Sequence, residues 1–199
     1  MKIAAVQMVS TPRVADNLEV ARTLVARAAA EGAGLVALPE YFCFMGRSDR
    51  DKLGVAEAPG DGPIQRMLAE TAREHRVWLI GGTLPLTLAA SASGEGGDVD
   101  RVTNSDLVFS PDGELAARYD KIHLFAYDNG REHYDEGRTL RAGAAPAAFD
   151  AAGVRVGLSV CYDLRFPELY RALMQPPCDL LSVPSAFTHT TGAAHWEVL

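Results

Sequence analysis

The sequence predicts an α/β protein with mixed sheets, built as a single domain over residues 1–199. Two observations predict this class: short apolar runs typical of strands alternate with amphipathic helical segments, and one central region is typical of a β-hairpin. The chain has 199 residues, 48% of them hydrophobic, which is enough for one core of ordinary size. We find no internal repeat and no linker that would divide it.

The first half is predicted to alternate strands with helices. Apolar runs at 2–9, 35–40 and 77–83 have the length and composition of strands, and the second suits a strand covered on both faces. The helix between the first two strands is predicted to start at the Ser-Thr-Pro sequence of residues 10–12 and to end at Gly32 and Gly34.

A second helix is predicted to start near Pro63, and a hairpin to follow the third strand. The hairpin strands span 102–109 and 113–124, joined by the turn sequence Ser-Pro-Asp-Gly. Residues 89–100, which lie between the third strand and the hairpin, are rich in small and polar side chains and are predicted to form a flexible surface excursion. A further strand, helix and strand are expected at 152–162, from Pro167, and at 178–187.

Composition favours a small-molecule partner. The net charge is -7, and the basic residues are scattered rather than clustered, which argues against binding of nucleic acid or an anionic membrane surface. No apolar run approaches the ~20 residues that span a bilayer, and the N-terminal run is too short for a secretory signal, so we expect a cytoplasmic location. Three cysteines without paired spacing favour neither a disulfide framework nor a structural zinc site, and no cofactor is predicted.

Three chemically complementary residues lie at the ends of strand-like runs: Glu40 ends "LVALPE", Lys121 follows "LAARYD", and Cys161 comes at the end of "VRVGLSV". Ligands of open α/β sheets gather at the carboxyl ends of strands, although a Glu or Lys there is commonly just solvated and a Cys just buried. A catalytic thiol needs a base, a role open to Glu40. Attack on an amide or nitrile creates negative charge that an ammonium group such as that of Lys121 would stabilise.

The sequence around Cys161 predicts a sharp corner between strand and helix. Such an elbow exposes the sulfur and aims the backbone N–H of Tyr162 at the developing oxyanion. Together the three residues and this corner make up the parts of an acyl-transfer cycle that needs neither metal nor nucleotide.

The segments "LPEYF", "YDKIHLF", "VCYDLRFPEL" and "PSAFTHTTGAAHWEVL" resemble the nitrilase superfamily of carbon-nitrogen hydrolases. The resemblance implies a Glu-Lys-Cys triad at Glu40, Lys121 and Cys161, and an α-β-β-α four-layer sandwich that assembles into a homodimer or larger homo-oligomer. The second glutamate of the family falls on Glu136, with Glu132 as a competitor of poorer spacing. Members of the family continue beyond "HWEVL", so the chain is expected to lack the last helix and strands.

Within the superfamily, the sequence is most similar to the amidase branch that includes deaminated-glutathione amidase and omega-amidase. This resemblance implies that a small carboxylated amide, such as deaminated glutathione or 2-oxoglutaramate, is cleaved through a Cys thioester with release of ammonia or an amine. Arg165 is either a clamp for the substrate carboxylate or a structural residue paired with Asp163. Tyr41 is expected to wall the pocket beside Glu40.

Two other functions remain open at this point. One is a non-catalytic or regulatory relative that serves as a dimerising module. The other keeps the same triad but acts as an N-acyltransferase or a nitrilase.

Overall fold

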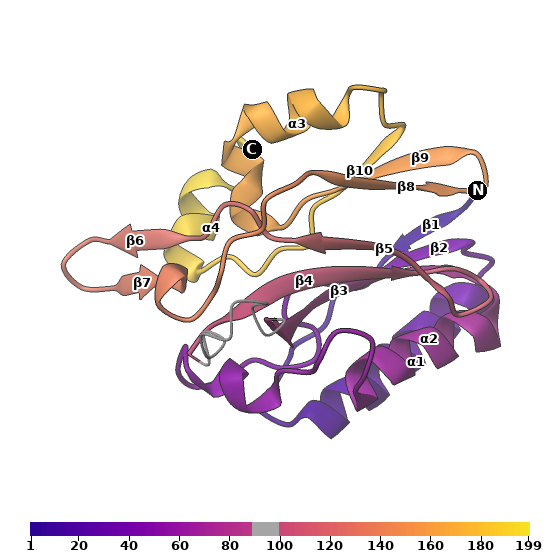
Figure 1. Cartoon of the computed structure of the whole chain (residues 1–199), viewed down its shortest axis with the longest axis horizontal. Coiled ribbons are helices and arrows are strands. Elements are labelled where there is room, and N and C mark those ends of the chain that lie inside the picture. Colours follow the sequence, from indigo (N-terminus) through magenta and orange to yellow (C-terminus); the bar gives the residue numbers. More distant parts are fainter. Residues whose placement is uncertain (89–99) are drawn as a thin grey trace, which may run out of the picture.

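The computed structural model describes residues 1–88 and 100–199, so the predicted excursion at 89–100 lies, except for Asp100, outside the described residues. Two β-sheets pack face to face, and helices cover their outer faces (Figure 1). The order of layers is helices, sheet, sheet, helix. This arrangement confirms the predicted α-β-β-α sandwich with mixed sheets.

The larger sheet has five strands in sequence order and carries the first two helices on its outer face (Figure 1). The first three strands are parallel, and the last two continue antiparallel as the predicted hairpin. Its elements are β1 (Ile3–Ala5), α1 (Val14–Ala30), β2 (Leu35–Ala37), α2 (Pro63–His75), β3 (Trp78–Thr87), β4 (Val102–Phe109) and β5 (Leu115–Asp120).

The smaller sheet has three strands in the order β10, β9, β8, with β10 parallel and β8 antiparallel to the central β9. Its elements are β8 (Ala147–Ala151), β9 (Val154–Leu158), α3 (Pro167–Leu173) and β10 (Leu180–Ser182). The connections add a hairpin, β6 (Ala126–Asp128) and β7 (His133–Asp135), the helix α4 (His189–His195), and the single 3-10 turns η1 (Asp51–Val55), η2 (Glu136–Arg138) and η3 (Cys161–Arg165).

Two apolar cores hold the layers together. One lies between the first two helices and the larger sheet, where Val25 and Leu68 pack with strand residues such as Leu79. The other lies between the two sheets, where Val108 of the larger sheet and Leu158 of the smaller one are fully buried. Burial of apolar area is the main force that stabilises such layers, so the second core is what brings the two sheets together.

The start of α1 differs from the sequence prediction. The helix begins at Val14, and its N-cap is Arg13, whose side chain makes no capping hydrogen bond. Instead, the buried Asn17 amide accepts from the Thr11 N–H at 2.9 Å and donates to the carbonyls of Thr11 at 2.7 Å and Cys43 at 2.9 Å. The Asn17 side chain thus satisfies backbone hydrogen-bonding groups of the segment before the helix, and the Ser-Thr-Pro sequence gives no sign of this.

Gly82 interrupts β3 where that strand passes closest to the chain that leads to Glu40. The register between β3 and β4 shifts between Ile80 and Thr83, and Gly82 adopts a φ of 62°. A Cβ atom on Gly82 would lie 2.1 Å from the Pro39 carbonyl oxygen. Beyond the irregularity, the Thr83 hydroxyl oxygen accepts from the Tyr41 N–H at 2.9 Å. Because Gly82 has no side chain, the backbone on either side of Glu40 can pack directly against β3.

We predict that Gly82→Ala destabilises the protein by about 3–5 kcal/mol, because the methyl group adds a backbone clash to the cost of a positive φ. Gly60→Ala is a matched control: Gly60 has a φ of 83°, but nothing lies within 4 Å of its added Cβ. That control should cost only about 1 kcal/mol. Urea unfolding measures both, and equal losses would contradict a role for the close contact with Pro39.

Candidate active site

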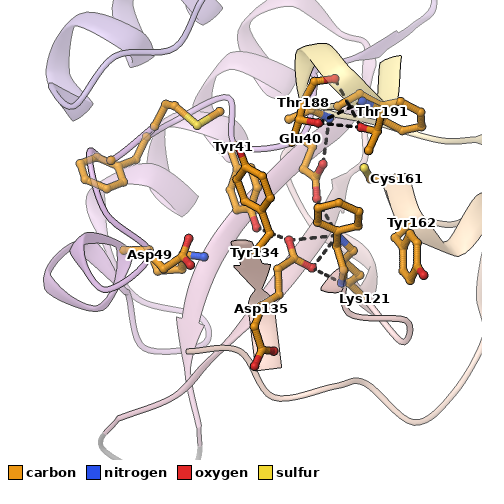
Figure 2. A pocket seen from close by; sticks show the side chains of 18 of the residues that line it. Glu40, Tyr41, Asp49, Lys121, Tyr134, Asp135, Cys161, Tyr162, Thr188 and Thr191 are labelled. Atoms are coloured by element: carbon orange, nitrogen blue, oxygen red, sulfur yellow. Dashed lines mark hydrogen bonds and ion pairs between the residues drawn. The ribbon is translucent and has the colours of Figure 1, made fainter. Parts of the chain in front are cut away.

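The structure brings all the sequence-predicted site residues to one cavity of about 400 Å³. Figure 2 shows Glu40, Lys121 and Cys161 converging at its wall, although they come from three distant parts of the chain. The predicted residues that line the cavity are Glu40, Tyr41, Lys121, Glu136, Cys161, Tyr162 and Arg165. Glu40 and Lys121 follow strands of the larger sheet, and Cys161 follows a strand of the smaller one. The site therefore lies where the two sheets meet.

Glu40 lies three residues beyond the last residue of β2, in a turn rather than in the strand itself. It is 3% exposed, yet its carboxylate is well supplied with hydrogen-bond donors. Oε1 accepts from Asn104 Nδ2 at 3.0 Å and from Lys121 Nζ at 3.1 Å, and Oε2 accepts from the Ala186 N–H at 2.9 Å. Burial raises the pKa of Glu40, opposed by the charge of Lys121 and reinforced by that of Glu136. A carboxylate held in place with a raised pKa has the properties of a general base.

Lys121 directly follows β5, and its backbone N–H donates to the Asn104 carbonyl at 2.9 Å. Its side chain is 1% exposed. The ammonium group lies 3.1 Å from Glu40 Oε1 and 2.9 Å from Glu136 Oε2. Burial alone would lower the pKa of Lys121, but the two carboxylates outweigh burial and raise it. The ammonium therefore stays charged and fixed at the cavity wall.

Glu136 begins the 3-10 turn η2 and is held from two sides. Its carboxylate accepts from the Phe125 N–H at 2.7 Å and from the Tyr41 hydroxyl at 2.9 Å, besides its ion pair with Lys121. The competing residue, Glu132, accepts from the Thr190 hydroxyl at the surface and is not part of the cavity lining. The geometry therefore favours Glu136 over Glu132 as the second glutamate.

Cys161 occupies the sharp corner that the sequence predicts. It has a φ of 48° and opens the 3-10 turn η3, which leads into α3. Its N–H donates to the Pro184 carbonyl at 3.0 Å, which ties the corner to the segment after β10. A non-glycine residue in the left-handed region is strained, and such strain is common where a side chain must point into a site.

The Cys161 thiol is 8% exposed. Burial raises the pKa of Cys161, and the charge of Glu40 and a hydrogen bond to it act in the same direction, while Lys121 opposes them. The resting sulfur is therefore a thiol, and a nucleophilic attack by this sulfur would require the loss of its proton. Glu40 is the candidate base beside it.

Asp163 connects the corner at Cys161 with the strand that carries Lys121. It is fully buried, and its carboxylate accepts from the Tyr119 hydroxyl at 2.7 Å, the His123 N–H at 3.0 Å and the Val160 N–H at 2.8 Å. Tyr119 and His123 flank Lys121, and Val160 precedes Cys161. One carboxylate thus fixes the two segments relative to each other.

Arg165 corrects one of the sequence interpretations, because it does not pair with Asp163, whose carboxylate is occupied by other groups. Its Nη2 donates to His195 Nδ1 at 2.9 Å, and the guanidinium lies 5.3 Å from the ring centres of both Tyr162 and Phe187. Arg165 still lines the cavity, so the structure retains it as a candidate carboxylate clamp.

Sequence reasoning missed three groups around the triad. Asn104 and the Ala186 N–H bind the Glu40 carboxylate, and Lys52 lines the cavity from η1. A signal for Asn104 does exist, since the buried strand β4 contains four consecutive polar residues, Thr103 to Asp106. Polar side chains in a buried strand generally have a partner, which here is Glu40.

Within residues 1–88 and 100–199, the structure has no cluster of three or more His, Cys, Asp or Glu side chains placed to hold a metal ion. In the same part of the chain, none of the helices has the length and apolar character required to cross a bilayer.

Comparison with known proteins places this geometry in a family. The chain is 36% identical over 200 residues to a deaminated glutathione amidase of Synechocystis sp., with 98% of this chain and 70% of that protein covered. It is 37% identical over 199 residues to the omega-amidase NIT2 of Homo sapiens, with 100% of this chain and 68% of that protein covered.

Two solved structures share the fold. The C. elegans NitFhit protein superimposes with a TM-score of 0.82 at 35% identity, with 98% of this chain and 46% of that chain covered, so the present chain spans about half of that protein. An amidase from Nesterenkonia sp. superimposes with a TM-score of 0.79 at 26% identity, with 98% of this chain and 68% of that chain covered. A mutant of the latter shows the result of Michael addition of acrylamide at its active site cysteine.

The sequence model of the family "Carbon-nitrogen hydrolase" matches residues 2–199. The match extends over almost the whole sequence, including the three strand ends and the corner at Cys161 that form the cavity wall. On this match, together with the amidases that resemble it, the chain belongs to the carbon-nitrogen hydrolases of the nitrilase superfamily.

Proposed function

We propose that this protein hydrolyses the amide bond of a small carboxylated amide, such as deaminated glutathione or 2-oxoglutaramate, through a thioester on Cys161. The observation that carries the proposal is the convergence of Glu40, Lys121 and Cys161 on one cavity, with the lysine ammonium held between the buried carboxylate of Glu40 and the partly buried one of Glu136. The similar proteins from Synechocystis and Homo sapiens are amidases, which favours amide hydrolysis over a non-catalytic, acyltransferase or nitrilase function.

In the first half of the proposed cycle, the Cys161 sulfur attacks the amide carbon while Glu40 takes the thiol proton. The carbonyl oxygen becomes an oxyanion, which the Lys121 ammonium and the Tyr162 N–H stabilise. Glu40 then gives its proton to the amide nitrogen, the C–N bond breaks, and ammonia or an amine leaves a thioester behind. Because the resting sulfur is a thiol, proton transfer to Glu40 accompanies the attack.

In the second half, Glu40 removes a proton from water, and the resulting hydroxide attacks the thioester carbon. A second oxyanion forms at the same position, the C–S bond breaks, and the sulfur recovers the proton from Glu40. The products are the carboxylic acid and a regenerated thiol, so the cycle needs no external co-reactant. Glu136 stays outside the bond changes and positions Lys121.

The proposal includes assembly into a homodimer or larger homo-oligomer and a cytoplasmic location. Both remain predictions from the sequence and the family resemblance. Size-exclusion chromatography with light scattering measures the first directly.

The proposed thioester is tested by intact-protein mass spectrometry after rapid mixing with 2-oxoglutaramate. We expect an acyl adduct that maps to Cys161, with ammonia released at the same time, and no adduct in Cys161→Ala. Cys178→Ala is a suitable control, because that partly buried thiol donates to the Leu173 carbonyl, does not line the cavity, and should leave the adduct unchanged. Absence of both adduct and ammonia across a panel of small amides would overturn the proposal.

A further inference from the structure

Lys52 presents an ammonium group at the cavity without a hydrogen-bond or ion-pair partner among residues 1–88 and 100–199. It belongs to η1, lines the cavity, and is partly buried. Its ammonium group lies over the ring of Tyr41, whose centre is 5.4 Å from Nζ. A partly desolvated ammonium over an aromatic face retains most of its capacity to bind an anion.

Lys52 reaches the cavity from a different segment than the reacting groups. It belongs to η1, which follows Asp49, and Figure 2 shows Asp49 on the opposite side of the view from Cys161 and Tyr162. The Lys52 ammonium lies over the ring of Tyr41, whose hydroxyl donates to Glu136. An anion bound there would be the part of a substrate remote from the amide at Cys161.

The other cations that line the cavity have neighbours or lie at the surface, and among them Arg165 also stays a candidate carboxylate clamp. Lys121 is paired with two carboxylates, and Arg165 donates to His195 and stacks on two rings. Arg47 is exposed to solvent. Burial lowers the pKa of Lys52, while the charges of Glu136 and Asp49 act in the opposite direction. Lys52 is thus the partly buried cation of this cavity whose charge no neighbour pairs directly.

We propose that Lys52 binds the carboxylate of the substrate, at the end remote from the amide that is cleaved, and so selects amides that carry a terminal carboxylate. This inference rests on the proposed amidase function and assigns a residue to the selection of its substrate. The competing role for Lys52 is to balance the charge of Glu136 and Glu40, and the two roles predict different kinetics.

The test compares succinamate with its uncharged isostere 4-methylpentanamide in the full-length protein. Lys52→Met should raise the KM for succinamate by about 10- to 100-fold, the range expected for loss of one charged hydrogen bond, with kcat nearly unchanged. The kinetics of the uncharged amide should not change, and Lys52→Arg should recover part of the loss. Lys2→Met, a remote surface substitution, should leave both substrates unaffected.

Equal changes with both substrates would overturn the inference in favour of charge balance, and unchanged kinetics with both would also overturn it. A binding measurement keeps the inference separate from catalysis. Calorimetry measures the binding of succinate to Cys161→Ala and to the double variant Cys161→Ala/Lys52→Met. The dissociation constant should be about tenfold or more higher for the double variant. Equal affinities would overturn the Lys52 inference, whereas ammonia release from neither amide by the wild-type protein would count against the proposed function alone.

Discussion

Lys121→Met should both lower turnover strongly and destabilise the fold. The substitution removes the ammonium that stabilises the oxyanion, and loss of one such donor lowers kcat by about 10²–10³-fold. It also leaves the carboxylates of the buried Glu40 and the partly buried Glu136 without their cation, and breaking a buried pair such as Lys121–Glu40 costs about 3–5 kcal/mol. Ammonia release and urea unfolding measure the two effects.

The two effects of Lys121→Met are separable with a second variant. Adding Glu136→Gln removes one of the unpaired carboxylates, so the double variant should recover much of the lost stability. It should recover no activity, because the ammonium is still missing. A Lys121→Met protein that retains turnover within about tenfold of the wild type would remove Lys121 from the proposed mechanism.

Glu40→Gln should lower kcat/KM by about 10²–10⁴-fold, because the variant lacks the general base that takes the Cys161 proton. The amide also fits the site imperfectly. Oε1 accepts from Asn104 and Lys121, so the amide nitrogen must replace Oε2, where it faces the donating N–H of Ala186. A further loss of stability of about 1–3 kcal/mol is therefore expected.

The pH profile separates the role of Glu40 from a structural one. The base must be ionised, and burial raises the pKa of Glu40, so the acid limb of kcat/KM in the wild type should lie above the range of an ordinary glutamate. Because the charge of Glu136 also raises this pKa, Glu136→Gln should move the acid limb to lower pH. An acid limb that persists unchanged in Glu40→Gln would assign it to another group.

Glu40, Lys121 and Cys161 could be singled out from the sequence because each lies at or just after a run of residues that predicts a strand. Ligands of α/β sheets gather at the carboxyl ends of strands, so the three residues were candidates for one site, and the structure brings them together from strands of both sheets. The corner at Cys161 was also predictable, because a buried strand ends only a few residues before the helix that begins at Pro167. The four-layer sandwich followed from the family resemblance.

Other parts of the fold carry weak local signals. The strand β8, with the sequence AAFDA, is short and rich in alanine, and so it escaped prediction even though it pairs along its whole length with β9. The hairpin of β6 and β7 was missed for the same reason, because its strands are three residues long and largely exposed. Such elements depend on their tertiary partners more than on propensity.

The partners of the triad depend on contacts that no local pattern encodes. Asn104 meets Glu40 across 64 residues of sequence, and the Ala186 N–H meets it across 146. The resting protonation state of Cys161 follows from burial beside Glu40. The fate of Arg165 was also open, because its pairing with His195 depends on where α4 packs.

Asp163 has a consequence for the way this enzyme loses activity. Its fully buried carboxylate joins the end of β5 and the segment after it to the segment after β9. The proposed base, Glu40, and the proposed nucleophile, Cys161, belong to different halves of the sandwich, so in the proposed mechanism neither half carries out chemistry by itself. Turnover therefore depends on the packing of the two sheets against each other. If the sheets separate, activity should be lost while the helices on the outer faces still give a native far-UV circular dichroism spectrum.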